Sequence, residues 1–199
     1  RIGIDDMESF EEMLHFVDTV AAAGCQTFIV HARKAWLQGL SPKENREIPP
    51  LHYDWVYRLK QERPALEIII NGGIDSLQAC AEHLQAVDGV MLGREAYQNP
   101  FLLAQVDHLV FGRENTPTDR ADIILALLPY IRSQMEQGSK LNHITRHILG
   151  LYQGVPGARK FRRHLSENAY REGATASVLE DAVALTLTST IEQTEKTDL

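Results

Sequence analysis

Cysteine is scarce in this sequence: there are two among 199 residues, and they form no CxxC pair. A disulfide framework is therefore excluded, and a reducing compartment, the cytoplasm, is the expected location. Long apolar runs are also missing, since no stretch approaches the roughly 18 residues that a membrane-spanning helix needs, and no signal peptide is recognisable. The hydrophobic content of 44% is still enough for the core of a globular protein.

An initial methionine is absent too. The opening residues RIGIDD read as the end of a strand entering a loop, so we expect further sequence before Arg1. Strand and helix patterns then alternate without hairpin signals, which predicts parallel strands with right-handed crossovers. Four strands, counting the stub at Arg1, fit either a small doubly wound sheet or half of a (β/α)8 barrel, and periodicity does not separate the two.

Strand patterns stop after Gly112. From there the sequence shows only helical apolar spacing interrupted by glycines. We therefore predict two domains: an α/β domain over residues 1–112 and an all-α helical bundle over residues 113–199.

The stretch EIIINGGIDS (67–76) shows an apolar run that ends abruptly in glycines. The three isoleucines favour a strand covered on both faces, as in parallel sheets. Gly72 and Gly73 then open a turn before a helix that Asp75 or Ser76 can cap, which leaves backbone N–H groups for an anion. An ordinary βα turn is the alternative.

A second turn of this kind follows the next strand, in GVMLGREAYQNP (89–100). Gly93 and Arg94 again stand at a strand end before a helix, and an arginine can hold a phosphate in a forked contact. Barrel enzymes commonly bind phosphate in the loops after their last two strands. The pair of turns thus favours a phosphate-bearing cofactor, although Arg94 could instead form a surface ion pair with Glu95 or Asp88.

The strand TFIVH and the loop after it supply further candidates. His31 ends the strand, where barrels present catalytic or cofactor-contacting side chains, but a hydrogen-bonded core histidine is equally compatible. The loop suits an extended anionic substrate, or is simply a solvated charged loop. Its basic residues are Arg33, Lys34, Lys43 and Arg46.

Positive charge gathers in the helical part of a chain whose net charge is −7. Between Lys140 and Arg171, seven basic residues accompany the single acid Glu167. A solvated helix face is the plain interpretation, but this clustering against an acidic background favours nucleic acid. The candidates that share a helix face are Arg159, Arg162 and Arg163. His143 and His147 are four residues apart but have no third ligand, so we predict no metal site.

Three segments resemble the bacterial tRNA-dihydrouridine synthases, most closely subgroup A: VHARKAWLQGLSPKENREIPPLHYDWV, INGGI and GVMLGREAYQNP. The HARKAWLxGLSPKENR and IPPLxY motifs are the part specific to this family, because many flavin barrels share the NGGI and GR turns. The resemblance implies an FMN-dependent (β/α)8 barrel with a helical tRNA-binding domain, which uses NADPH to reduce D-loop uridine to 5,6-dihydrouridine.

The resemblance also implies roles for individual residues. His31 would lie against the flavin, and the FMN phosphate would be held by Asn71, Gly72, Gly73, Gly93 and Arg94. No catalytic residue is expected in this chain, because the family's proton-donating cysteine falls upstream of Arg1. Two alternatives are a small-molecule flavin oxidoreductase of the dihydroorotate or enoate type and a non-catalytic tRNA-binding fragment. A half barrel would also expose sheet edges, which favours self-association.

Overall fold

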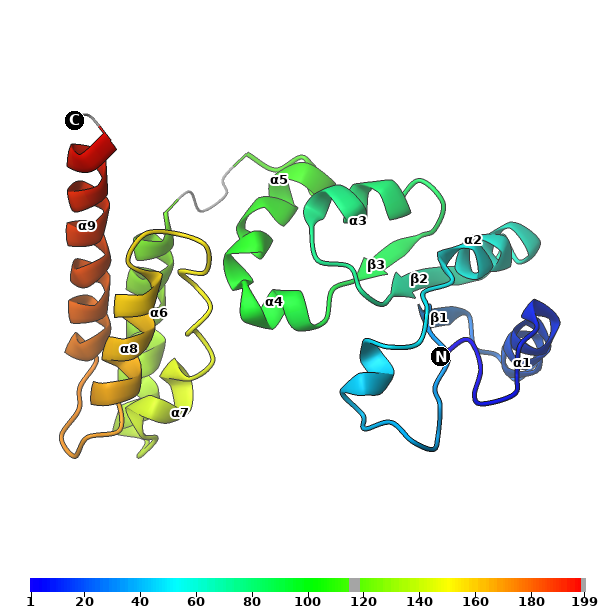
Figure 1. Cartoon of the computed structure of the whole chain (residues 1–199), viewed down its shortest axis with the longest axis horizontal. Helices are drawn as coiled ribbons and strands as arrows, with labels where there is room; N and C mark the ends of the chain where they lie inside the picture. The colour runs from blue at the N-terminus through cyan, green and yellow to red at the C-terminus, as the bar shows by residue number, and fades with distance from the viewer. Residues whose placement is uncertain (115–118, 198–199) are drawn as a thin grey trace. The chain divides into compact units, whose positions relative to one another are not determined.

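The computed structural model describes residues 1–114 and 119–197, with the backbone alone for 188–197 (Figure 1). The chain forms two compact units, Arg1–Arg94 and Glu95–Leu199. The division lies upstream of Gly112, where the sequence pattern changes, because the short helices after the last strand belong to the second unit. The functional domains over 1–112 and 113–199 remain a prediction.

The first unit alternates helices with the strands of one parallel sheet. Its elements are α1 (Phe10–Ala22), β1 (Thr27–His31), η1 (Glu44–Arg46), α2 (Tyr53–Glu62), β2 (Glu67–Asn71), α3 (Leu77–His83) and β3 (Gly89–Met91). The next helix, α4 (Arg94–Gln98), begins at the last residue of this unit and belongs otherwise to the second. The strands pair in the order β1-β2-β3, both pairs parallel, as predicted. The stub expected at Arg1 makes only an isolated parallel bridge, between Ile4 and Ala35.

In the described residues helices cover one face of the sheet, whereas the expectation for β2 was cover on both faces. Val30, Ile68 and Ile70 lie in a core with residues of α1, α2 and α3, whereas Ile29 and Met91 on the opposite face are 56% and 41% exposed. A doubly wound sheet carries helices on both faces. Helices on one face are the arrangement of a (β/α)8 barrel, whose other face points inward.

The second unit is helical throughout its described residues. It contains η2 (Pro100–Gln105), α5 (Val106–Phe111), α6 (Arg120–Glu136), α7 (Leu141–Thr145), α8 (Ala158–Asn168) and α9 (Ser177–Thr197). Its core is built around Ile131 of α6, Phe161 and Leu165 of α8 and Leu179 of α9, all at most 1% exposed. Across the described ranges, no helix is long and apolar enough to cross a membrane.

Two close contacts join the segment after β3 to the rest of this unit. A Cβ placed on Gly150 would lie 2.0 Å from the carbonyl oxygen of Gln98, so only glycine allows the two backbones to approach this closely. The Arg120 guanidinium lies 3.7 Å from the ring centroid of Phe101 and donates to the carbonyl of Leu151. The position of residues 95–101 is therefore set by the helical unit.

Candidate functional site

Three side chains form a row at the carboxyl end of the sheet. The strand register aligns His31 of β1 with Asn71 of β2 and Asn71 with Met91 of β3, and all three lie on the face that the helices leave open. The Asn71 amide nitrogen is 3.4 Å from the sulfur of Met91. His31 and Asn71, both predicted site residues, are thus neighbours at the edge where barrel enzymes place their active sites.

The glycine turn after β2 is packed against the end of the long loop, which comprises residues 32–52 between β1 and α2. Gly72 and Gly73 have φ of +119° and +70°, and a Cβ on either would come within 3.2 Å or 2.8 Å of the Leu51 side chain. Both glycines are therefore required by the fold itself, through backbone conformation and packing, before any ligand is considered. Gly72 also lies beside the His31 ring, 3.4 Å from where its Cβ would be.

Sequence reasoning missed a half-buried cluster of Tyr53, Tyr57 and His83 beside this turn. The Tyr53 hydroxyl donates to the Gly72 carbonyl at 2.6 Å, and the Tyr53 ring packs edge-on against His83 at 4.5 Å. His83 Nδ1 lies 2.6 Å from the Tyr57 hydroxyl. Burial raises the pKa of Tyr53 and lowers that of His83, so both stay neutral. The only signal in the sequence was the IPPLxY motif, whose tyrosine, Tyr53, is the first residue of α2.

We expect Tyr53→Phe to lower the free energy of unfolding of the first unit by about 0.5–1.5 kcal/mol, because the Gly72 carbonyl loses its donor. Urea denaturation followed by tryptophan fluorescence reports this unit, since Trp36 and Trp55 both lie in it. Tyr130→Phe, at a tyrosine 54% exposed in the other unit, is the control and should change little. An unchanged urea midpoint for Tyr53→Phe would show that the hydrogen bond from Tyr53 to Gly72 does not stabilise the turn.

The second predicted turn, at Gly93 and Arg94, does not need its glycine for packing, unlike the first. Gly93 has an ordinary φ and open space where its Cβ would lie, so nothing in the described chain requires glycine there. Arg94 forms its ion pair with Glu47 of the long loop, at 2.5 Å, and not with Glu95 or Asp88 as considered from the sequence. The pair holds the Arg94 guanidinium toward the loop, at the same end of the sheet as His31.

Positive charge surrounds His31. Burial, followed by the charges of Arg1 and the amino terminus and then those of Arg33 and Arg94, lowers the pKa of His31 to about 4, so its ring is neutral at physiological pH. Its Nδ1 is buried without a hydrogen-bond partner, as is Nε of Arg33. The edge therefore combines neighbouring arginines with unused polar atoms, an environment suited to an anionic ligand that carries hydrogen-bonding groups.

The basic loop residues divide between the turn and the surface. Arg33 donates to the carbonyl of Pro49 and lies close to Gly73, so it belongs to the glycine turn. Lys34 is paired with Glu8 at 2.9 Å and its side chain is only 12% exposed. Lys43 and Arg46 are exposed. Among the four, these last two are the ones that the structure leaves open to a large partner.

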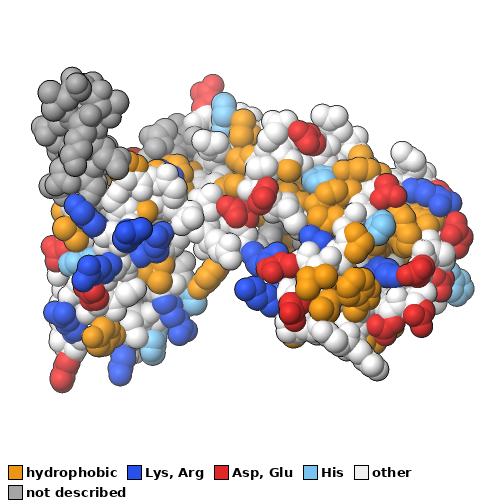
Figure 2. All heavy atoms as spheres, in the orientation of Figure 1, with side chains coloured by type: hydrophobic (Ala, Val, Ile, Leu, Met, Phe, Trp, Pro, Cys, Tyr) orange, Lys and Arg blue, Asp and Glu red, His pale blue; other side chains and the backbone are white. Residues whose placement is uncertain are grey.

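Figure 2 shows Lys and Arg side chains gathered over α8 in the helical unit. Arg159 and Arg163 are exposed there, and Arg163 forms an ion pair with Glu167 at 2.7 Å. Arg162 is half-buried and donates to the side chain of Gln153 at 3.1 Å. The predicted arginines thus share the helix, but Arg162 faces a cavity and the other two face solvent.

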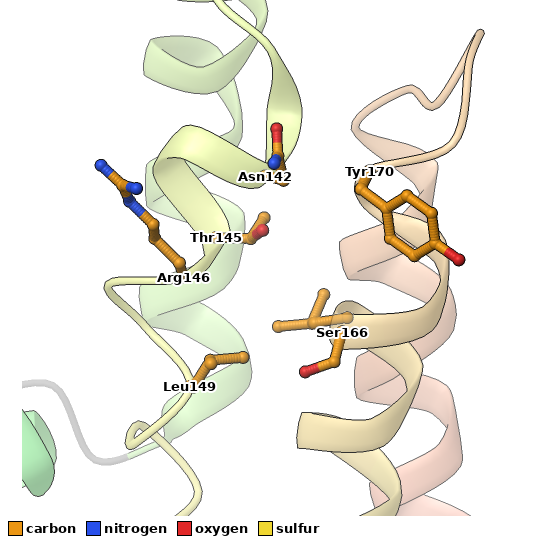
Figure 3. A pocket seen from close by; sticks show the side chains of 7 residues that line it. Asn142, Thr145, Arg146, Leu149, Ser166 and Tyr170 are labelled. Carbon is orange, nitrogen blue, oxygen red and sulfur yellow. The ribbon is translucent and has the colours of Figure 1, made fainter.

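That cavity has a volume of about 370 Å³ and lies wholly within the helical unit. Its polar lining includes Tyr97, Arg146, His147 and Arg162. A second cavity, between α7 and α8, is lined by Asn142, Thr145, Ser166 and Tyr170, and there Arg146 points outward (Figure 3). In the described residues, no group of three His, Cys, Asp or Glu side chains is placed to hold a metal ion.

Comparison with known proteins identifies the family of the chain. A family model described as dihydrouridine synthase (Dus) matches residues 1–187. A tRNA-dihydrouridine(20/20a) synthase of Shewanella oneidensis is 58% identical over 193 residues, which cover 97% of this chain and 58% of that protein. The enzymes of the same name from Salmonella typhi and Escherichia coli K12 are 58% identical over 93% of this chain. The chain spans about half the length of the curated relatives it matches, 54–58%. Over that span, it belongs to the dihydrouridine synthase family.

Proposed function

We propose that this chain is part of an FMN-dependent enzyme that reduces uridine in the D-loop of tRNA to 5,6-dihydrouridine with NADPH as reductant. Family membership and the names of the relatives support the reaction and the tRNA substrate. The cytoplasm, where tRNA is modified, is the proposed location. Because the chain covers about half of each relative, the proposal concerns the whole protein.

The observation that carries the cofactor assignment is the open space at Gly93. A glycine that neither conformation nor packing requires, next to Arg94 and close to a second glycine turn, is suited to the close approach of a phosphate. We propose that Asn71, Gly72, Gly73, Gly93 and Arg94 hold the FMN phosphate. In this structure Glu47 forms an ion pair with Arg94. When a phosphate binds, this ion pair would have to break, or Glu47 and the phosphate would share the guanidinium.

Bound FMN would supply the hydride chemistry that side chains cannot perform. This chain's contribution is to bind and orient. His31, neutral because its pKa is about 4, would lie against the flavin. Neither cysteine suits the proton donor, since Cys80 is buried and the Cys25 thiol donates to the carbonyl of Thr27 at the start of β1. We propose that the donor lies upstream of Arg1.

The helical unit and the long loop would grip the tRNA. A uridine inside folded tRNA must leave its stack before it can react, at a cost of roughly a few kcal/mol. Contacts to backbone phosphates can offset that cost. We propose that backbone phosphates are contacted by Lys43, Arg46, Arg159 and Arg163, with Arg162 contributing from its cavity. Arg33 and Lys34 would contribute indirectly, because Arg33 holds the glycine turn and Lys34 is paired with Glu8.

The test is flavin retention and dihydrouridine formation by the full-length protein. Replacing Arg94 with alanine removes one charge-assisted contact and should weaken FMN binding by about 10- to 100-fold. Arg58→Ala is the matched control, since Arg58 pairs with Glu11 and Glu62 away from the turns. A wild-type protein that binds no flavin would overturn the proposal. Flavin turnover with dihydroorotate or an enoate but not tRNA would favour the small-molecule oxidoreductase, and tRNA binding without turnover the non-catalytic module.

We also propose that the chain in isolation self-associates through its sheet. The inward face leaves Ile29 and Met91 exposed, and in the described part of the chain neither β1 nor β3 has a second strand partner. Exposed edges and apolar faces favour pairing with another copy. In a closed barrel the same surface would be covered.

A further inference from the structure

The cavity beside α8 is called the Tyr97 pocket here and is defined by Tyr97, Arg146, His147 and Arg162. It is built from segments far apart in the sequence: α4, the end of α7 and α8. None of the residues that line it is acidic, and two of them are arginines. Its volume of about 370 Å³ falls at the small end of the roughly 300–1,000 Å³ typical of ligand pockets.

The hydrogen bonds in the pocket fix which groups remain for a ligand. Arg146 Nε donates to His147 Nε2 at 3.2 Å, and the Tyr97 hydroxyl lies 2.9 Å from His147 Nδ1. A guanidinium can only donate, so Nε2 must carry no proton, and the neutral ring then carries its proton on Nδ1. Nδ1 therefore donates to the Tyr97 oxygen. The hydroxyl proton of Tyr97 is left free to donate to a ligand.

The remaining groups match one nucleotide of RNA. The hydrogen bond to His147 uses only Nε of Arg146, so its terminal guanidinium nitrogens can contact a ligand. They point away from the neighbouring cavity in Figure 3, and Arg162 supplies a second positive charge. Two guanidinium groups and a hydroxyl donor suit a phosphodiester. The Tyr97 side chain is 56% exposed, so its ring can stack on an unpaired base. Amide groups of Gln98 and Gln153 lie in the same lining.

We infer that the Tyr97 pocket binds one unpaired nucleotide of the tRNA, with its phosphate on Arg146 and Arg162 and its base on the Tyr97 ring. The inference rests on the proposed function, since it takes tRNA as the partner, and it adds a specific anchoring point separate from the flavin site. The neighbouring cavity lacks these features, because its own polar side chains are uncharged and Arg146 points out of it.

The experiment measures tRNA affinity of the full-length protein at several salt concentrations. Arg146→Gln should weaken binding by about 10- to 100-fold and lower the log–log salt slope by about 0.7–0.9. Tyr97→Phe removes only the hydroxyl and should weaken binding by about 2- to 10-fold. The charge-matched control is Arg132→Gln, on α6 and paired with Glu180, which should change affinity by less than about twofold.

Each outcome separates the pocket from the general proposal. Wild-type tRNA binding with unchanged affinity in both pocket variants would overturn the inference and leave the proposed function standing. Equal losses in Arg132→Gln and Arg146→Gln would also overturn it, because the effect would then be diffuse charge. Failure of the wild-type protein to bind tRNA would overturn the proposed function, and the inference with it. Far-UV circular dichroism of each variant establishes that the helical unit is folded.

Discussion

Phe161→Ala should lower the free energy of unfolding of the helical unit by about 3–5 kcal/mol. Phe161 has no exposed surface, and its ring centroid lies 4.4 Å from that of Tyr152. It stands on the face of α8 that packs against the rest of the core, so truncation removes buried apolar area and leaves a cavity among side chains that can relax only in part. A loss of this size is a large fraction of the stability of an ordinary domain.

Two spectroscopic probes separate this effect from changes in the other unit. Far-UV circular dichroism is dominated by helices, most of which lie in Glu95–Leu199, whereas both tryptophans lie in Arg1–Arg94. The dichroism midpoint in urea should fall and the fluorescence midpoint should stay. Phe111→Ala is the control: that ring is 65% exposed, and its loss should cost no more than about 1 kcal/mol. Equal midpoints for Phe161→Ala and wild type would contradict the core described above.

The sequence predicted the alternation of elements well because each signal was local. Three consecutive isoleucines and the glycines after them define β2 and its turn whatever surrounds them. Periodicity could not distinguish a barrel from a doubly wound sheet, since the apolar run is the same for a strand inside a barrel and for one between two helix layers. The family now settles that question, because dihydrouridine synthases have a TIM-barrel-type fold.

Side-chain partners across the fold were beyond sequence reasoning for a different reason. Glu47 and Arg94 are far apart in the chain, and only the folded loop brings them to 2.5 Å. The hydrogen bond from Tyr53 to Gly72 likewise depends on how α2 lies against the turn. The glycines at 72 and 73 were correctly singled out, but the structure gives them a packing reason that was not foreseen, and Gly93 becomes the more informative glycine.

Gly150→Ala should destabilise the helical unit by about 3 kcal/mol, near the upper end of the usual cost of overpacking. The new Cβ would lie 2.0 Å from the carbonyl oxygen of Gln98 and 2.7 Å from its carbonyl carbon. Both are backbone atoms, so no rotamer change can relieve the clash, and the chain around Gln98 must move. Tyr97 is the preceding residue, so its hydroxyl should lose its contact with His147.

Gly150→Ala should therefore affect both the stability of the helical unit and its binding of tRNA. We expect a lower dichroism midpoint together with a loss of tRNA affinity at least as large as that of Tyr97→Phe. The control in the same unit is Ser133→Ala, at an exposed position of α6, where the effect on stability should stay within about 1 kcal/mol. If Gly150→Ala instead unfolds like the wild type and binds tRNA equally well, then the segment 95–101 is not held against the helices by this contact, and the Tyr97 pocket is not a fixed site.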